Sequence, residues 1–202
     1  MNTIGLKPVL AGLLVRLTLL TTVSLFVLSC TAQSVWEASE VKGKVSVFKC
    51  FTVGDKFQIT NSNYIDPKKY RSEYDINRLD FSYVSLASYD PFLDAFKESF
   101  STSRITQLAR VNDFVSLIIN VDEQGQILGI YFSLDKRTTI LPEELEILER
   151  ELFSKVKFIV IGKKVEDLIF YRVPLSIFFT EVQSGEIRSV RNSVNLKTKY
   201  KN

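Results

Sequence analysis

Histidine is absent from this chain of 202 residues, and cysteine, proline and glycine are scarce. Without histidine, the chain cannot build a Ser-His-Asp or Cys-His nucleophilic system or an HExxH zinc site. Its two cysteines, Cys30 and Cys50, form neither a CxxC pair nor a cysteine-based zinc cluster. The eight glycines form no GxGxxG motif and no Walker loop. The sequence therefore predicts a protein without a metal or a cofactor.

Neither sign of charge dominates the chain. Lys7 and Arg16 are the only charged residues among the first 32, which leaves 24 basic and 23 acidic residues in the remainder. A nearly neutral body gives no reason to expect nucleic acid as a partner. Hydrophobic residues make up 46% of the chain, which is typical of a protein with a packed core.

Residues 1–29 have the pattern of a signal segment. Lys7 and Arg16 precede an apolar run of 12 residues, which is shorter than the roughly 20 that a membrane span needs. Extending the run back to Val9 would place Arg16 inside the membrane, at a cost of about 2.5–3.5 kcal/mol on insertion scales. The sequence thus predicts a cleaved signal and export to the periplasm or outer membrane of a bacterium.

Two cleavage sites overlap at the end of this segment. Residues 27–30 (VLSC) resemble the lipobox of bacterial lipoproteins, in which Cys30 becomes the lipidated first residue. Residues 30–32 (CTA) instead fit a small-x-small site that is cut before Gln33. We favour the lipobox, which makes a membrane the first partner through a lipid anchor; the other cut predicts a freely diffusing protein. Either cut leaves Cys50 unpaired, and its apolar neighbours predict a buried strand residue.

The body of the chain is expected to have two parts and a tail. Residues 30–88 predict a β-rich region, with a hairpin in residues 43–60 around the turn-forming pair Gly54-Asp55. Residues 89–184 predict the order helix, strand, strand, helix, strand. Residues 185–202 form a basic tail, which is expected to be frayed.

The first predicted helix of the second part starts at Asp90, a good N-cap, with Pro91 at N1. Its apolar face consists of Phe92, Leu93, Phe96 and Phe100.

The next two strands alternate in residues 114–121 and 128–134, and Gly125 in their connection is free to adopt a positive φ. Leu128 is expected to be a core residue of the return strand.

The second helix spans Pro142 to about Val156, with Glu143, Glu146 and Arg150 opposite its apolar face. Glu146–Arg150 and Glu151–Lys155 are predicted ion pairs. The last strand covers about residues 168–180, and Pro174 places it at a sheet edge or at a bend.

Three motifs in this order resemble the C-terminal domain of TonB, the periplasmic energy-coupling protein. They are VDEQGQI at 121–127, LPEEL at 141–145 and VPLSIF at 173–178. The resemblance spans about residues 92–179. It implies a β-β-α-β module preceded by a short helix, and a partner peptide that is taken up as an added strand at a sheet edge. The five prolines form no proline-rich spacer, so energy transduction is not implied.

The sequence thus predicts an α+β, non-enzymatic lipoprotein of the cell envelope that binds a protein or peptide partner through a sheet edge. Phe170, Arg172 and Pro174 are the candidate residues at this edge. The other interpretation of these residues is a plain edge strand that charge and proline protect from pairing.

Two alternative functions stay open. Asp90, Asp94 and Glu98 on the first helix, with the glutamates of the second, could serve a carboxylate-based envelope hydrolase. Acids at this spacing more often form a solvated helix face. A divergent TonB-type transducer is the further alternative, and it requires an uncleaved N-terminus. An enzyme should show acids converging in a concave pocket, and a binding module an open edge.

Overall fold

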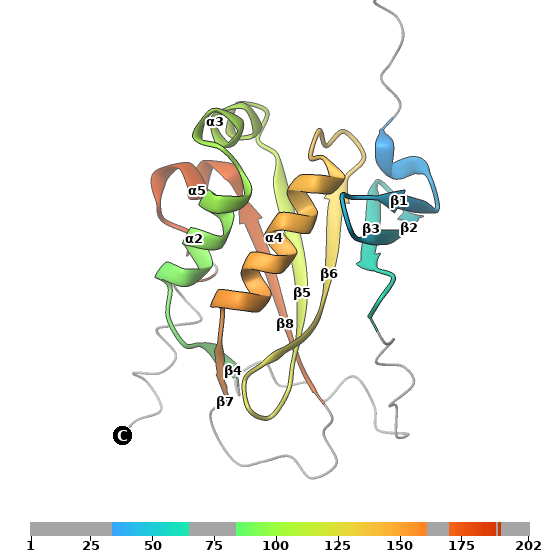
Figure 1. Ribbon diagram of the computed structural model, residues 1–202. Helices are drawn as coiled ribbons and strands as arrows, with labels where there is room; N and C mark the ends of the chain where they lie inside the picture. The colour runs from blue at the N-terminus through green and yellow to red at the C-terminus, as the bar shows by residue number, and fades with distance from the viewer. Residues whose placement is uncertain (1–33, 65–83, 161–169, 189, 191–202) are drawn as a thin grey trace, which may run out of the picture. The chain divides into compact units, whose positions relative to one another are not determined.

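A six-stranded antiparallel sheet forms the centre of the fold (Figure 1). The computed structural model describes residues 34–64, 84–160, 170–188 and 190. In the order of the sheet, the strands are β1 (Glu40–Lys42), β2 (Val47–Val53), β3 (Lys56–Asn61), β6 (Ile127–Asp135), β5 (Phe114–Val121) and β8 (Tyr171–Phe178). Strands and helices are both abundant, so the predicted α+β class is confirmed.

This one sheet contains strands from both parts that the sequence predicted, residues 30–88 and 89–184. β3 is paired with β6 in antiparallel register, so the N-terminal hairpin extends the sheet of the C-terminal part. The predicted turn lies between β2 and β3, where Gly54 has a φ of +61°. The two sequence segments therefore share one fold.

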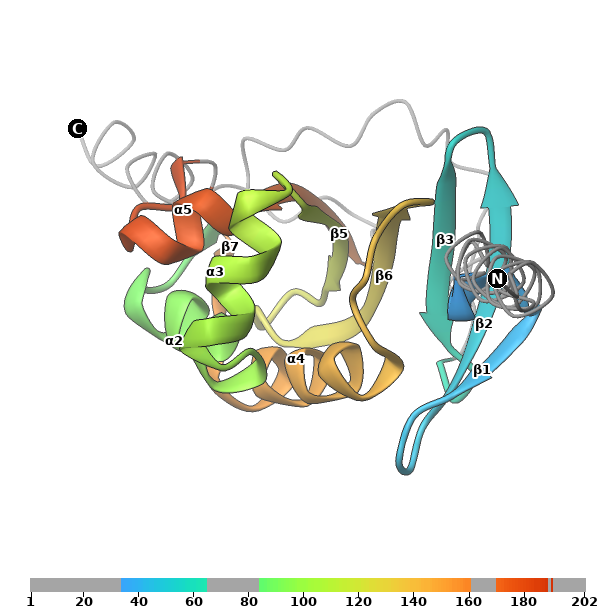
Figure 2. The same ribbon diagram turned by 90° about the horizontal axis from the view of Figure 1, so that it is seen from above.

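Helices lie against one face of the sheet (Figure 2). α4 (Pro142–Lys155) packs against α2 (Asp90–Ser99), and α3 (Thr102–Arg110) packs against α5 (Phe179–Ser184). α2 and α4 were predicted, whereas α3 and α5 are missing from the order that the sequence suggested. The N-cap of α2 is Tyr89 and not Asp90, and no side chain caps this helix.

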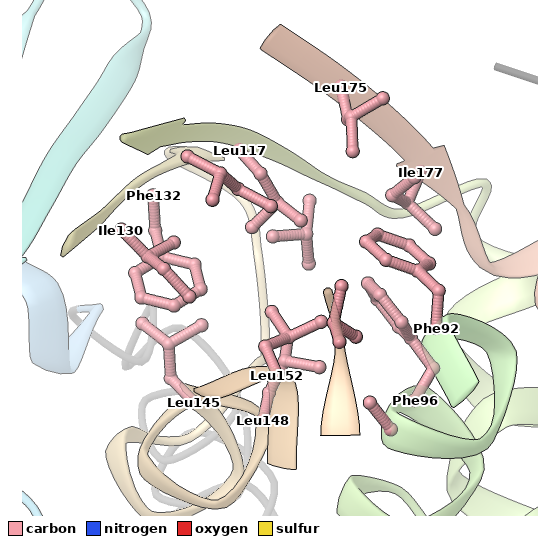
Figure 3. Packing of buried hydrophobic residues seen from close by; sticks show 14 of the residues in the cluster. Phe92, Phe96, Leu117, Ile130, Phe132, Leu145, Leu148, Leu152, Leu175 and Ile177 are labelled. Carbon is pink, nitrogen blue, oxygen red and sulfur yellow. The ribbon is translucent and has the colours of Figure 1, made fainter. Parts of the chain in front are cut away.

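The hydrophobic core lies between α2, α4 and the face of the sheet turned toward them, which we call the inner face (Figure 3). Side chains of a strand alternate between faces, so every second strand residue enters the core. The inner-face residues of β8 are Tyr171, Val173, Leu175 and Ile177. The helices contribute Phe92, Phe96, Leu145, Leu148 and Leu152. The opposite face is called the outer face.

The hairpin of β5 and β6 contains a β-bulge. The register shifts between Asn120 and Val121, so Val121 pairs with Ile127. Ile127 therefore enters the core and Leu128 is 48% exposed, which corrects the prediction of Leu128 as a core residue. Gly125 has a φ of +81°, as its place in the connection predicted.

The tip of this hairpin contacts a second, two-stranded sheet. That sheet pairs β4 (Val84–Leu86) with β7 (Phe158–Val160). Phe158 N–H donates to Gly125 O at 3.0 Å. A Cβ atom at Gly125 would lie 1.9 Å from Phe158 O, so the contact requires glycine.

Glu146 lies on a buried side of α4, whereas the helix pattern predicted it on the solvent side. The turn between β1 and β2 covers it, and Val45 N–H donates to Glu146 Oε1 at 3.1 Å. The predicted Glu146–Arg150 pair is wrong, because Arg150 contacts Glu151 at 3.0 Å. The predicted Glu151–Lys155 pair is present at 3.1 Å.

The described residues begin with a segment that belongs to the core. Trp36, in the 3-10 helix η1 (Val35–Glu37), is 1% exposed, and its Nε1–H donates to Ile140 O at 2.8 Å. In the predicted tail, Ile187 and Val190 are also buried. Cys30 and the rest of the predicted signal segment lie outside the described residues. Among the described helices, none has the length and apolarity to cross a bilayer.

Candidate binding edge

β8 is an edge strand of the six-stranded sheet. Within the described ranges, the neighbour to which it is hydrogen-bonded in this sheet is β5. An edge is one of the two positions that Pro174 predicted, because a proline in a central strand would leave a ladder bond unmade. Pro174 lies opposite Ile118 in the β5–β8 ladder. Of the two predicted positions, an edge or a bend, the described sheet therefore has β8 at an edge.

The outward direction of the β8 backbone follows from the ladder. Phe179 N–H donates to Asp113 O at 3.1 Å, directly beyond the pair Phe114↔Phe178. In an antiparallel ladder, alternate residues exchange hydrogen bonds, so odd-numbered residues of β8 direct their N–H and C=O groups toward β5. Even-numbered residues direct theirs away from β5. Pro174 is even-numbered, so its missing N–H leaves the ladder intact.

The three residues that the sequence assigned to the edge lie beside one another. Arg172 and Pro174 occupy alternate outer-face positions of β8, and Phe170 precedes the strand. The guanidinium carbon of Arg172 lies 5.9 Å from the centroid of the Phe170 ring, within cation–π range. The aromatic ring thus helps to hold a positive charge at the start of the edge strand.

Asn120 is a further polar residue at this place, and sequence reasoning missed it. It lies opposite Arg172, in a pair that exchanges no ladder hydrogen bond and whose side chains are therefore close. Asn120 is 1% exposed, yet neither of its amide atoms has a hydrogen-bond partner, and Arg172 Nε has none. Buried polar atoms are nearly always paired, so these three unpaired atoms are an exception within the described fold. The sequence signal that could have revealed Asn120 is a single amide side chain within the apolar run LIINV at 117–121.

The outer face of the sheet is partly apolar. Phe51 is 54% exposed, and Ile118 and Phe178 are each 37% exposed. The Phe114 and Phe178 rings lie 5.4 Å apart, and Lys56 Nζ lies 5.4 Å from the centroid of the Phe114 ring. Of these residues, Phe114, Ile118 and Phe178 belong to the β5–β8 ladder, where they can contact the side chains of an added strand.

Two glutamates of α4 are buried under the N-terminal hairpin. Glu149 is 5% exposed, like its neighbour Glu146. Asn61 Nδ2 donates to Glu149 Oε2 at 2.7 Å, and Glu149 Oε1 has no hydrogen-bond partner. Burial raises the pKa of Glu149, the Asn61 and Tyr64 side chains lower it in part, and the charge of Glu146 raises it further.

The other acids that the sequence singled out lie on a solvated surface. Asp90 and Asp94 are exposed on α2, and Glu98 forms an ion pair with Lys155 of α4. In the ranges that the structure describes, no cluster of three acidic or cysteine side chains could hold a metal ion. Cys50 is buried on the inner face, as expected, and burial raises the pKa of its thiol to about 11, so that it stays protonated at neutral pH.

The comparison with known proteins shows a similarity of fold and none of sequence. No model of a known protein family matches the chain, and no curated protein sequence matches it. The fold is similar to that of a crystal structure of a DUF5043 family protein from Bacteroides uniformis, with a TM-score of 0.55 and 9% sequence identity. The similarity covers 73% of this chain and 93% of that chain. At this identity the likeness concerns the fold alone.

Proposed function

We propose that this protein is a non-enzymatic binding protein of the bacterial cell envelope, which takes up a peptide segment of a partner protein as an added strand along β8. The observation that carries the proposal is the edge, where Arg172 and Phe178 direct backbone groups away from β5. An incoming strand can pair with such groups at little cost. The resemblance of residues 92–179 to TonB C-terminal domains supports the same mode of binding.

Hydrogen exchange tests this mode of binding. The probe is a blocked eight-residue peptide, matched to the length of β8, of alternating threonine and valine with one glutamate. Its binding is expected to slow exchange of the Arg172 and Phe178 amides, which point away from β5. The Val173 and Ile177 amides, which already donate to β5, are the internal control and should not change. Protection of another strand, or of none, would contradict capture along β8.

Location at the envelope is the second part of the proposal. It is supported by the signal-like segment and by Cys30 in the lipobox-like sequence VLSC. The measurement is the intact mass of the protein purified from the membranes of its native host. We expect a mass that begins at Cys30 and includes acyl chains. A mass beginning at Gln33 would remove the anchor, and one beginning at Met1 would favour the TonB-type transducer.

A carboxylate-based envelope hydrolase is the second candidate function. One observation favours it: burial raises the pKa of Glu149, as the general acid of a glycosidase requires, and Glu146 lies one turn away. Both carboxylates, however, accept hydrogen bonds from the protein itself, Glu146 from Val45 and Glu149 from Asn61. These hydrogen bonds give the two acids a structural role, because they connect the N-terminal strands to α4. For this reason we place the hydrolase function second.

A further inference from the structure

The pair Asn120–Arg172 combines buried, unused hydrogen-bonding groups with a positive charge. Asn120 Nδ2 and Arg172 Nε are donors without a partner, and Asn120 Oδ1 is an acceptor without one. They belong to side chains that face each other across β5 and β8. A negatively charged group that accepts two hydrogen bonds matches the two donors, Asn120 Nδ2 and Arg172 Nε. A backbone N–H of the same ligand can donate to the acceptor, Asn120 Oδ1.

Arg172 differs from the lysines of the outer face in its cross-strand neighbour. On the outer face of the sheet, Lys49 lies opposite Glu40 and Lys56 lies opposite Asp135, so each of these lysines has an acidic cross-strand neighbour. Asp135 is already paired with Arg137 at 3.0 Å, and this contact holds the pKa of its carboxyl below the usual range. Among the residues that the structure describes, the cross-strand neighbour of Arg172 is instead the neutral Asn120.

We propose that the Asn120–Arg172 pair binds a carboxylate side chain of the captured peptide, so that the edge selects acidic peptides. This inference rests on the proposed capture along β8 and names the class of peptide that is captured. An added strand lies directly beside β8, which puts its outer-face side chains next to Arg172. A glutamate there can reach the guanidinium. Its carboxylate also lies within range of the Asn120 amide, so the acid sets the register of the added strand as well as its affinity.

The test compares the glutamate peptide with the same peptide carrying glutamine in its place. Dissociation constants are measured by fluorescence anisotropy with labelled peptides. A charge-assisted hydrogen bond at a partly buried site predicts that the glutamate peptide binds about tenfold more tightly. The Nε–H signal of Arg172 and the side-chain amide signals of Asn120 should shift in the NMR spectrum with the glutamate peptide alone.

Two variants and a matched control test whether the preference for the glutamate peptide depends on Asn120 and Arg172. Arg172→Gln removes the charge, and Asn120→Asp supplies a carboxylate that occupies Arg172 from within the protein; both should remove the preference. Arg110→Gln changes an exposed arginine of α3, and this variant should retain the preference for the glutamate peptide. Equal binding of both peptides to the unmodified protein would overturn acid selection while leaving strand capture in place. Failure of both peptides to bind would overturn the proposed function together with this inference.

Discussion

Replacing Gly125 by alanine is expected to lower the free energy of unfolding by about 2–5 kcal/mol. Gly125 has a φ of +81°, a conformation that costs an alanine about 1–2 kcal/mol. The new Cβ would also lie 1.9 Å from Phe158 O and 2.8 Å from Phe158 C. Both are backbone atoms, which cannot move aside as the end of a flexible side chain can. The hairpin tip must therefore separate from β7 and lose the Phe158–Gly125 hydrogen bond.

Gly54→Ala is the matched control for this prediction. Gly54 also has a positive φ, +61°, but a Cβ there meets no atom within 4 Å. This variant should therefore lose only the conformational part, about 1–2 kcal/mol. Chemical denaturation of the three proteins measures the difference. Equal losses for the two alanine variants would mean that the contact between the hairpin tip and β7 does not hold in solution.

Replacing Glu149 by glutamine is expected to make the protein less sensitive to rising pH. Burial raises the pKa of Glu149 in the folded protein above its ordinary value of 4.5. Below pH 4.5 the carboxyl is protonated in both states, and its contribution to stability is fully present. As the pH rises, the unfolded chain ionises first, so stability falls until the pH passes the folded pKa. Each unit of pKa difference corresponds to about 1.4 kcal/mol.

Glutamine can keep the hydrogen bond from Asn61 without carrying a buried charge. The variant should therefore equal or exceed the parent protein in stability at pH 7.5, while the two differ less near pH 4.5. Unfolding free energies at both pH values measure this, with Glu143→Gln of the same helix as control. The lowered pKa values of Asp135 and Glu151 act in the opposite direction, but they are common to all the proteins and cancel. Identical pH profiles would show that burial does not perturb Glu149.

Much of the candidate edge could be predicted from the residues of the strand itself. Pro174 carries no N–H, and this single fact confined the last strand to an edge or a bend. The alternation of apolar residues along the strand then assigned Arg172 to the face opposite the core, where the structure places it. Neither argument could reveal Asn120, because the partner of a strand residue depends on which strands pair and in which register.

In the helical region too, the sequence predicted one feature correctly and could not predict another. The apolar stripe of α4 was readable from a repeat close to 3.6 residues, and the burial of Leu145, Leu148 and Leu152 confirms it. The same repeat put Glu146 in solvent, but the turn between β1 and β2 covers it. A helix pattern describes the faces of an isolated helix, and it cannot include a hairpin that arrives from a distant part of the chain.

By itself, the sequence determined the α+β class, most strands of the sheet, and the helices α2 and α4. It also showed that Gly125 can adopt a positive φ and confined β8 to an edge or a bend. Each of these follows from the backbone preferences and periodicity of neighbouring residues. Only the tertiary structure decided that one sheet unites both parts of the chain, that Glu146 and Glu149 are buried, and that Asn120 faces Arg172. These features depend on strand order, register and a bulge, which are set by the packing of segments far apart in the sequence.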